Sequence, residues 1–156
     1  MRLSGFPESR GFVQLLPAGL FLSERQVFCA LERAISAFAS GSGFSKKPAL
    51  DFLARFCATH RISEAVSRIK FSSGAQETVA VLCLVKPADE KFALAFLAKN
   101  FGFSASDKAL PSENARVESA KKFYSVSERE LSSFSGMPEA RAVELLVLER
   151  IAMAGL

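Results

Sequence analysis

The chain of 156 residues is 49% hydrophobic and 23% charged, and its net charge is a modest +4. This composition is typical of one globular domain and excludes disordered, collagen-like and coiled-coil chains, so we expect a single domain over residues 1–156. No uncharged run approaches the ~20 apolar residues of a membrane span. Glu8 lies where a signal peptide would have its apolar stretch, and we therefore expect a cytoplasmic protein with no membrane partner.

The first part of the chain predicts one or two short strands and then a helix. Residues 12–16 are typical of a strand, and residues 20–22 predict a second, shorter one. Ser23 and Gln26 have the spacing of a capping box, and the helix that they open ends at Gly41. The apolar residues that recur at helical spacing in this helix are Val27, Phe28, Leu31, Ile35 and Phe38.

A second helix begins at Pro48, because proline suits the first turn of a helix. Arg55 on this helix is expected to point to solvent. The helix breaks near Thr59, and a short helix follows. The apolar stripe of the second helix consists of Leu50, Leu53, Phe56 and Cys57.

The second half of the chain predicts two more strands and further helices, with a long polar surface segment between them. Few strands among several helices predict an α+β fold, in which a small, mostly antiparallel sheet packs with helices. The elements expected here are a strand at 78–85, a helix at 89–101, a surface segment with one short element at 104–122, a strand at 123–126, a capped helix at 127–134 and a last helix at 138–154.

The last helix is apolar almost all round. Val143 and Val147 lie on one stripe, whereas Leu145 and Leu148 lie on another, roughly opposite stripe. A helix of this kind is either buried within its own domain or packs one stripe inward and presents the other to a partner protein. Both readings remain open on the residues alone.

The positive charge has a location. Residues 46–70 contain six basic and two acidic side chains, so that the entire excess of +4 lies in this window. Localised positive charge is typical of proteins that bind a polyanion, although a solvated basic face gives the same pattern. The basic side chains of the window are Lys46, Lys47, Arg55, Arg61, Arg68 and Lys70, and the window also holds the only histidine, His60.

The sequence offers little for catalysis. It contains none of the common zinc, nucleophile-elbow or nucleotide-binding motifs. Cys29, Cys57 and Cys83 are far apart among apolar neighbours, which predicts buried thiols and no metal site. We therefore expect neither a catalytic residue nor a cofactor.

Several segments together resemble a known family. Residues 46–48, 51–53 and 60–66 resemble the small tRNA-recruiting subunit of the KEOPS complex, whose eukaryotic relative is the p53-related protein kinase binding protein. Residues 13–15, 142–144 and 148–152 fit the same family in order, so the resemblance spans nearly the whole chain. Two departures stand out: Cys57-Ala58 replaces a Ser-Gly break, and His60-Arg61 replaces an Arg-Gln pair.

The resemblance implies a protein that is not an enzyme. Family members bind the small kinase/ATPase subunit of the complex and hold the 3′ CCA end of tRNA, while the complex makes threonylcarbamoyl-adenosine beside the anticodon. DNA is not an expected partner. The tRNA-binding residues implied here are Lys46, Lys47, Arg55, His60, Arg61, Arg68 and Lys70. The implied kinase contacts are Leu145, Leu148, Ile151 and Ala152. From the stripes of the last helix we also expect Val143, Val147 and Ile151 to pack mainly on the protein's own sheet.

Two other classes of function remain open. One is a small ligand-binding domain or enzyme with an unrecognised pocket. The other is an interaction module with no role in RNA binding. A bound metabolite would favour the first, and indifference to RNA would favour the second.

Overall fold

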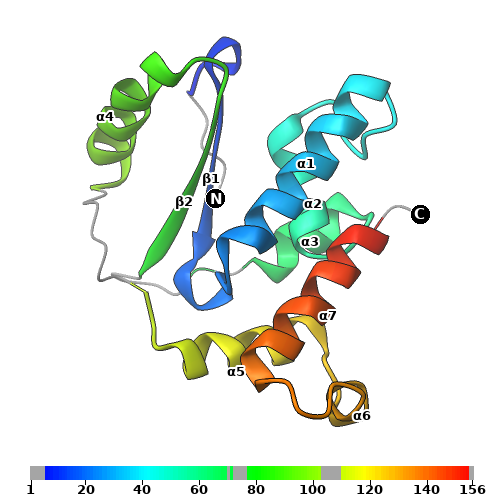
Figure 1. The fold of residues 1–156 in the computed structure, drawn as a ribbon. Coiled ribbons are helices and arrows are strands. Elements are labelled where there is room, and N and C mark those ends of the chain that lie inside the picture. The colour runs from blue at the N-terminus through cyan, green and yellow to red at the C-terminus, as the bar shows by residue number, and fades with distance from the viewer. Residues whose placement is uncertain (1–5, 70, 72–76, 103–109, 155–156) are drawn as a thin grey trace.

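The computed structural model describes residues 6–69, 71, 77–102 and 110–154. Strands β1 (Gly11–Pro17) and β2 (Thr78–Leu84) form an antiparallel pair in which Gly11 lies opposite Leu84. Helix α4 (Glu90–Phe101) covers one face of this sheet, and the other helices gather on the opposite side and below it (Figure 1). The expected α+β fold with a small antiparallel sheet is confirmed.

Six further α-helices lie in the described part of the chain. The helix that ends at the left-handed Gly41 is confirmed, as is the full capping box formed by Ser127 and Glu130. The remaining helices are α1 (Glu24–Ser40), α2 (Pro48–Phe56), α3 (Ile62–Arg68), α5 (Glu113–Tyr124), α6 (Glu128–Ser132) and α7 (Glu139–Met153). None of the helices in the described part of the chain is long and apolar enough to cross a membrane.

The apolar core has two parts. The larger part lies among α1, α2, α5 and α7, where Phe52, Phe56 and Val147 are fully buried. The smaller part lies between the sheet and α4, where Val13 and Leu97 pack together. The two strands thus carry apolar side chains on both faces, because helices cover both.

Two expected strands are wrong. Residue 20 ends a 3-10 helix, Ala18–Leu20, and residues 21–22 form no strand. Residues 123–124 end α5, a 12-residue helix in the segment 104–122 that the sequence predicted to be mostly irregular. Residues 103–109 of that segment lie outside the described part. The polar composition of α5 concealed the helix, because only Val117, Ala120 and Tyr124 are buried on its inner side.

Helix α1 buries only part of the side that its large apolar residues mark: Val27 is buried, but three of the others are exposed. Ala30 and Ala34 are fully buried, whereas Phe28 is 64%, Ile35 51% and Phe38 52% exposed. Helix α1 packs against both α2 and α7. Such close helix packing favours small side chains at the contact, since they let the axes approach.

Helix α7 packs mainly against α1 and α5, with smaller contacts to α2 and α6. Val143 and Val147 are fully buried as expected. The expectation that they pack on the sheet is wrong, because helices α1 and α2 lie between α7 and the strands (Figure 1).

Candidate functional site

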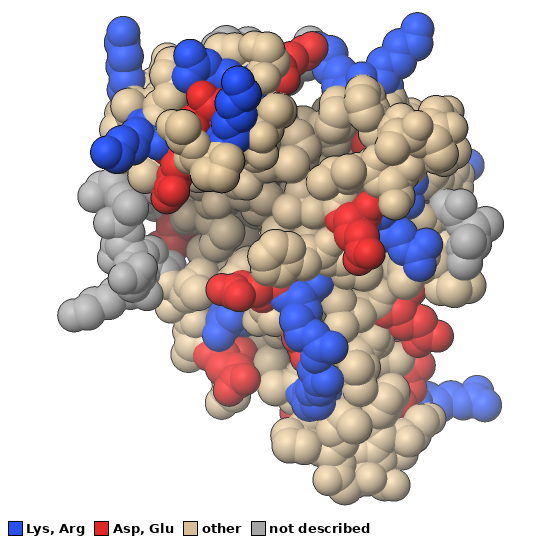
Figure 2. Space-filling model, turned by 45° about the horizontal axis from the view of Figure 1, so that its top comes forward, with Lys and Arg blue, Asp and Glu red and all other residues tan. Residues whose placement is uncertain are grey.

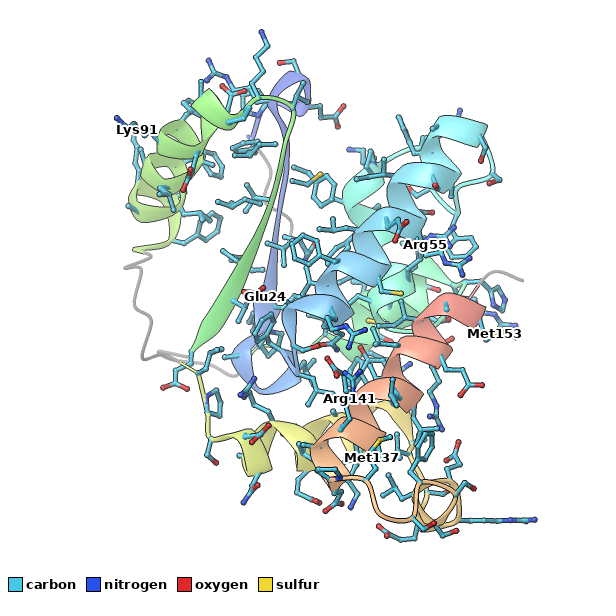
Figure 3. The ribbon with its side chains drawn as sticks, viewed as in Figure 1. Glu24, Arg55, Lys91, Met137, Arg141 and Met153 are labelled. Atoms are coloured by element: carbon cyan, nitrogen blue, oxygen red, sulfur yellow. The ribbon has the colours of Figure 1, made fainter. Side chains whose placement is uncertain are left out.

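Three helices end around one pocket. Its volume is about 460 Å³, and its lining comes from residues 58–60 after α2, 124–125 at the end of α5 and 153–154 at the end of α7, together with Arg68 and Arg150. His60 and Met153 are exposed at this pocket, and Met153 lies at the far end of α7 (Figure 3). The C-terminal ends of helices carry partial negative charge and free carbonyl oxygens. Where several such ends converge, positively charged hydrogen-bond donors are needed to balance that charge.

Two turns of unusual backbone conformation form the pocket wall. Ala58 and Ser125 have φ angles of 51° and 55° and are the only non-glycine residues of the described part with positive φ. Each ends a helix in the same way: Thr59 N–H bonds Ala54 O at 3.0 Å, and Val126 N–H bonds Lys121 O at 2.9 Å. This six-to-one pattern is the usual helix stop that requires a left-handed residue.

Arg55 lies within the core and balances the partial negative charge at the end of α7. The side chain is only 6% exposed, and its Nε donates to Asp51 Oδ2 at 2.7 Å. Its Nη1 donates to Ala154 O at the end of α7 at 3.3 Å, and its guanidinium lies 4.4 Å from the Phe44 ring centroid. The expectation that Arg55 points to solvent is therefore wrong. Three partners from three segments hold it inside.

Arg68 and Arg150 compensate the other helix ends. Arg68 Nη1 donates to Cys57 O at 2.7 Å, its Nη2 donates to Phe123 O, and its guanidinium covers the Phe123 ring at 4.3 Å. Arg150 Nη2 donates to Ser125 O at 3.2 Å and to Glu130 Oε1 at 2.7 Å. Arg150 is not among the site residues predicted from the sequence, although a basic residue in the last turn of a helix is the signal that fits this role.

Two buried titratable groups near the pocket, Tyr124 and Cys57, are held in their neutral forms. The Tyr124 hydroxyl donates to Phe56 O at 2.5 Å and accepts from Gln26 Nε2 at 2.9 Å, and burial raises its pKa well above the usual value. Burial also raises the pKa of the Cys57 thiol to about 12. Neither group has the lowered pKa that an activated nucleophile needs.

The three cysteines differ in burial. Cys57 is buried as expected, but Cys29 and Cys83 are only partly buried. Among the described residues, no group of three His, Cys, Asp or Glu side chains could hold a metal ion.

The exposed basic residues of the window fall into two groups. Lys46 and Lys47 precede α2, and Lys47 Nζ lies 3.8 Å from Glu8 Oε1. His60 and Arg61 follow α2 beside the pocket, about 14 Å away at the 1.5 Å rise of the nine helical residues between the groups. Lys70 lies outside the described residues. Figure 2 shows that, over the face it presents, Lys and Arg alternate with Asp and Glu and form no continuous basic field.

The predicted kinase contacts divide by burial. Leu145, Leu148 and Ala152 are partly exposed along one side of α7, whereas Ile151 is fully buried. The assignment of Ile151 to an interface is therefore corrected, because in this fold the side chain belongs to the core among α1, α5 and α7. The exposed Phe28, Ile35 and Phe38 on α1 are larger apolar groups that the sequence analysis did not treat as a contact surface.

A comparison with protein families gives one match over almost the entire chain. The model of the family described as "Kinase binding protein CGI-121" matches residues 8–155. No curated protein sequence matches the chain significantly.

Proposed function

The chain belongs to the CGI-121 family of kinase-binding proteins, and we propose that it binds the small kinase/ATPase subunit of the KEOPS complex and the 3′ CCA end of tRNA. The observation that carries this proposal is the family match over residues 8–155. CGI-121 proteins are non-catalytic adaptor subunits, so the protein contributes binding surfaces to threonylcarbamoyl-adenosine synthesis and none of its chemistry. The neutral, buried Cys57 and Tyr124 accord with such a role.

The proposed RNA surface consists of exposed side chains only. Lys46, Lys47, His60 and Arg61 are exposed, and a flexible lysine or arginine in solvent can reach a phosphate at little cost, since the 3.8 Å contact of Lys47 with the exposed Glu8 is a weak surface ion pair. Arg55 and Arg68 are left out, because both already donate to backbone carbonyls at helix ends. Their role is to stabilise the helix ends near which the exposed residues lie.

The proposed kinase surface is the outer side of α7, at Leu145, Leu148 and Ala152. These side chains are partly exposed while Val143, Val147 and Ile151 behind them are fully buried. One helix therefore combines an anchored inner side with an accessible apolar outer side. Such a surface suits a protein partner.

Co-purification with the kinase subunit tests this proposal. Leu148→Asp places a charge at the partly exposed position, and we expect it to lower kinase binding at least tenfold, because a desolvated carboxylate opposite apolar groups is costly. The melting temperature should fall only slightly. The matched control is Ile35→Asp on α1, which is 51% exposed and should leave kinase binding unchanged.

Two results would contradict the proposal in different ways. Unchanged binding by Leu148→Asp together with lost binding by Ile35→Asp would move the kinase surface to α1. Failure of the unmodified protein to bind the kinase subunit would contradict the kinase-binding proposal itself.

A further inference from the structure

We propose that the outer edge of β2 pairs antiparallel with the β2 strand of a second copy of this chain, so that two copies share one continuous sheet. The surface involved belongs to the sheet and not to the pocket or to the outer side of α7. The inference therefore stands independently of the proposed function.

The pairing of β1 with β2 directs one set of backbone groups of β2 outward. Val85 N–H donates to Arg10 O at 3.0 Å, beyond one end of the strand pair. Ala18 N–H donates to Glu77 O at 3.1 Å, beyond the other end. In an antiparallel pair, such hydrogen-bonded positions alternate with positions whose N–H and C=O point away from the neighbouring strand. Because the register is uninterrupted, the even-numbered residues of β2 point outward, and they include Ala80, Leu82 and Leu84.

This edge of the sheet is open. In the described part of the chain, the backbone groups of Ala80, Leu82 and Leu84 have no hydrogen-bond partner. Every residue of β2 except Val81 is partly exposed. The opposite edge differs, since the last five residues of β1 are buried. A further strand can therefore reach the sheet at β2.

The composition of β2 is unusual for a strand at an open edge. Edge strands are commonly protected by charged residues, proline or a bulge, because free backbone groups recruit other strands. Residues 78–84 contain no charge and no proline, and their register with β1 has no bulge. Their apolar side chains point both toward α4 and toward the larger part of the core, and helices cover both faces (Figure 1). Such a strand is typical of the interior of a sheet.

The same features indicate which strand is added. A strand beside β2 extends both covered faces, so it must itself be apolar on both faces, and β2 of a second copy meets this requirement. Charge then determines the direction, because exposed Glu77 precedes β2 and exposed Lys86 follows it. An antiparallel pair brings Glu77 of each copy near Lys86 of the other, whereas a parallel pair would bring like charges together.

The outward groups also determine the register. A two-fold axis at Leu82 places Ala80 opposite Leu84 of the second copy and Leu82 opposite the same residue of the second copy. Each of these pairs can then exchange two N–H···O bonds, as antiparallel strands do at hydrogen-bonded positions. The interface is symmetric and closes on itself, so it produces a dimer and not a fibre.

The test measures self-association of the full chain by analytical ultracentrifugation over a series of concentrations, and we expect a reversible monomer–dimer equilibrium. Glu77→Lys should raise the dissociation constant of the dimer about tenfold, because it places two basic groups together at each end of the paired strands. The double variant Glu77→Lys/Lys86→Glu exchanges the two charges and should restore the dissociation constant. The control Glu32→Lys makes the same change in charge at an exposed position of α1 and should have no effect.

Hydrogen exchange of the unmodified protein tests the register without a substitution. The odd-numbered amides of residues 79–83 bond to β1 in each copy and should be protected at every concentration. The even-numbered amides of residues 80–84 should become protected only at concentrations where the dimer predominates. This alternation is specific to pairing through the outer edge of β2.

Several results would overturn the proposal. They are a protein that remains monomeric at all concentrations, a dimer that Glu77→Lys does not weaken, a double variant that does not recover, and a dimer whose even-numbered amides stay unprotected. Protection of these amides only after addition of the kinase subunit would assign the edge to that partner and would equally contradict pairing with a second copy.

Discussion

Ala58 carries a methyl group at a position whose backbone conformation favours glycine. Ala58 has a φ of 51° and ends α2, and in this left-handed region a Cβ atom is crowded by the backbone. A Ser-Gly break, which the family resemblance implies here, would suit this backbone for a physical reason. Alanine here retains the backbone bonds of the helix stop at some cost in stability.

Ala58→Gly should therefore stabilise the protein. We expect the free energy of unfolding to rise by about 0.5–1 kcal/mol, since relief of left-handed strain exceeds the added entropy of the unfolded chain. The control Ala95→Gly, at an exposed interior position of α4, should lower it by about 1 kcal/mol. Urea denaturation of both variants measures the two effects, and a loss of stability in Ala58→Gly would contradict the left-handed assignment.

At the scale of the element, α1 shows how helical spacing can mislead. Its large apolar residues repeat as regularly as its alanines do, so helical periodicity alone does not tell which of the two sides is buried. The neighbouring helices determine which side of α1 is buried. Both α2 and α7 lie against α1, and small side chains at the contact allow that close approach.

This arrangement predicts opposite effects for two adjacent residues. Ala34→Leu should lower the free energy of unfolding by about 1–3 kcal/mol, because the fully buried site has no room for the added methylenes. Ile35→Ala, at a position that is 51% exposed, should change it by less than about 0.5 kcal/mol. Thermal and urea unfolding provide the measurement, and the reverse order would mean that α1 packs through its large apolar side.

At the scale of the whole molecule, the basic side chains of residues 46–70 are more widely separated on the surface than their closeness in the sequence suggests. Arg55 and Arg68 are bound to helix ends, and the exposed cations stand at opposite ends of α2. The proposed RNA binding would then depend on a few phosphate contacts at separate points of the surface, and its salt dependence should reflect that small number.

Charge reversal tests where those contacts lie. The double variant Lys46→Glu/Lys47→Glu should weaken tRNA binding and reduce the slope of log affinity against log salt by about 2, one for each lost phosphate contact. The matched variant Lys91→Glu/Lys99→Glu makes the same change in net charge on α4, across the sheet from α7 (Figure 3). It should bind tRNA nearly as the unmodified protein does. Equal losses in both variants would indicate a nonspecific effect of net charge.

The sequence by itself determined most of the local structure. Helix stops at Gly41 and Gly102, the capping box at Ser127 and the β-rich run 78–84 specify their elements through backbone preferences that need no distant partner. The family, too, was evident from short segments distributed along the chain. These features are encoded within a few residues of each other, so they can be recognised without the fold.

Only the tertiary structure decided which side chains remain available for function. Arg55 lies in the middle of the basic window, yet it is buried because the end of α7, 99 positions away, supplies a carbonyl partner. Ile151 joins the core for a similar reason, while its neighbour Ala152 stays partly exposed. The pocket likewise forms only where α2, α5 and α7 end together. Burial, and the pairing of charges across such distances, depends on packing between elements, and no local pattern of residues records it.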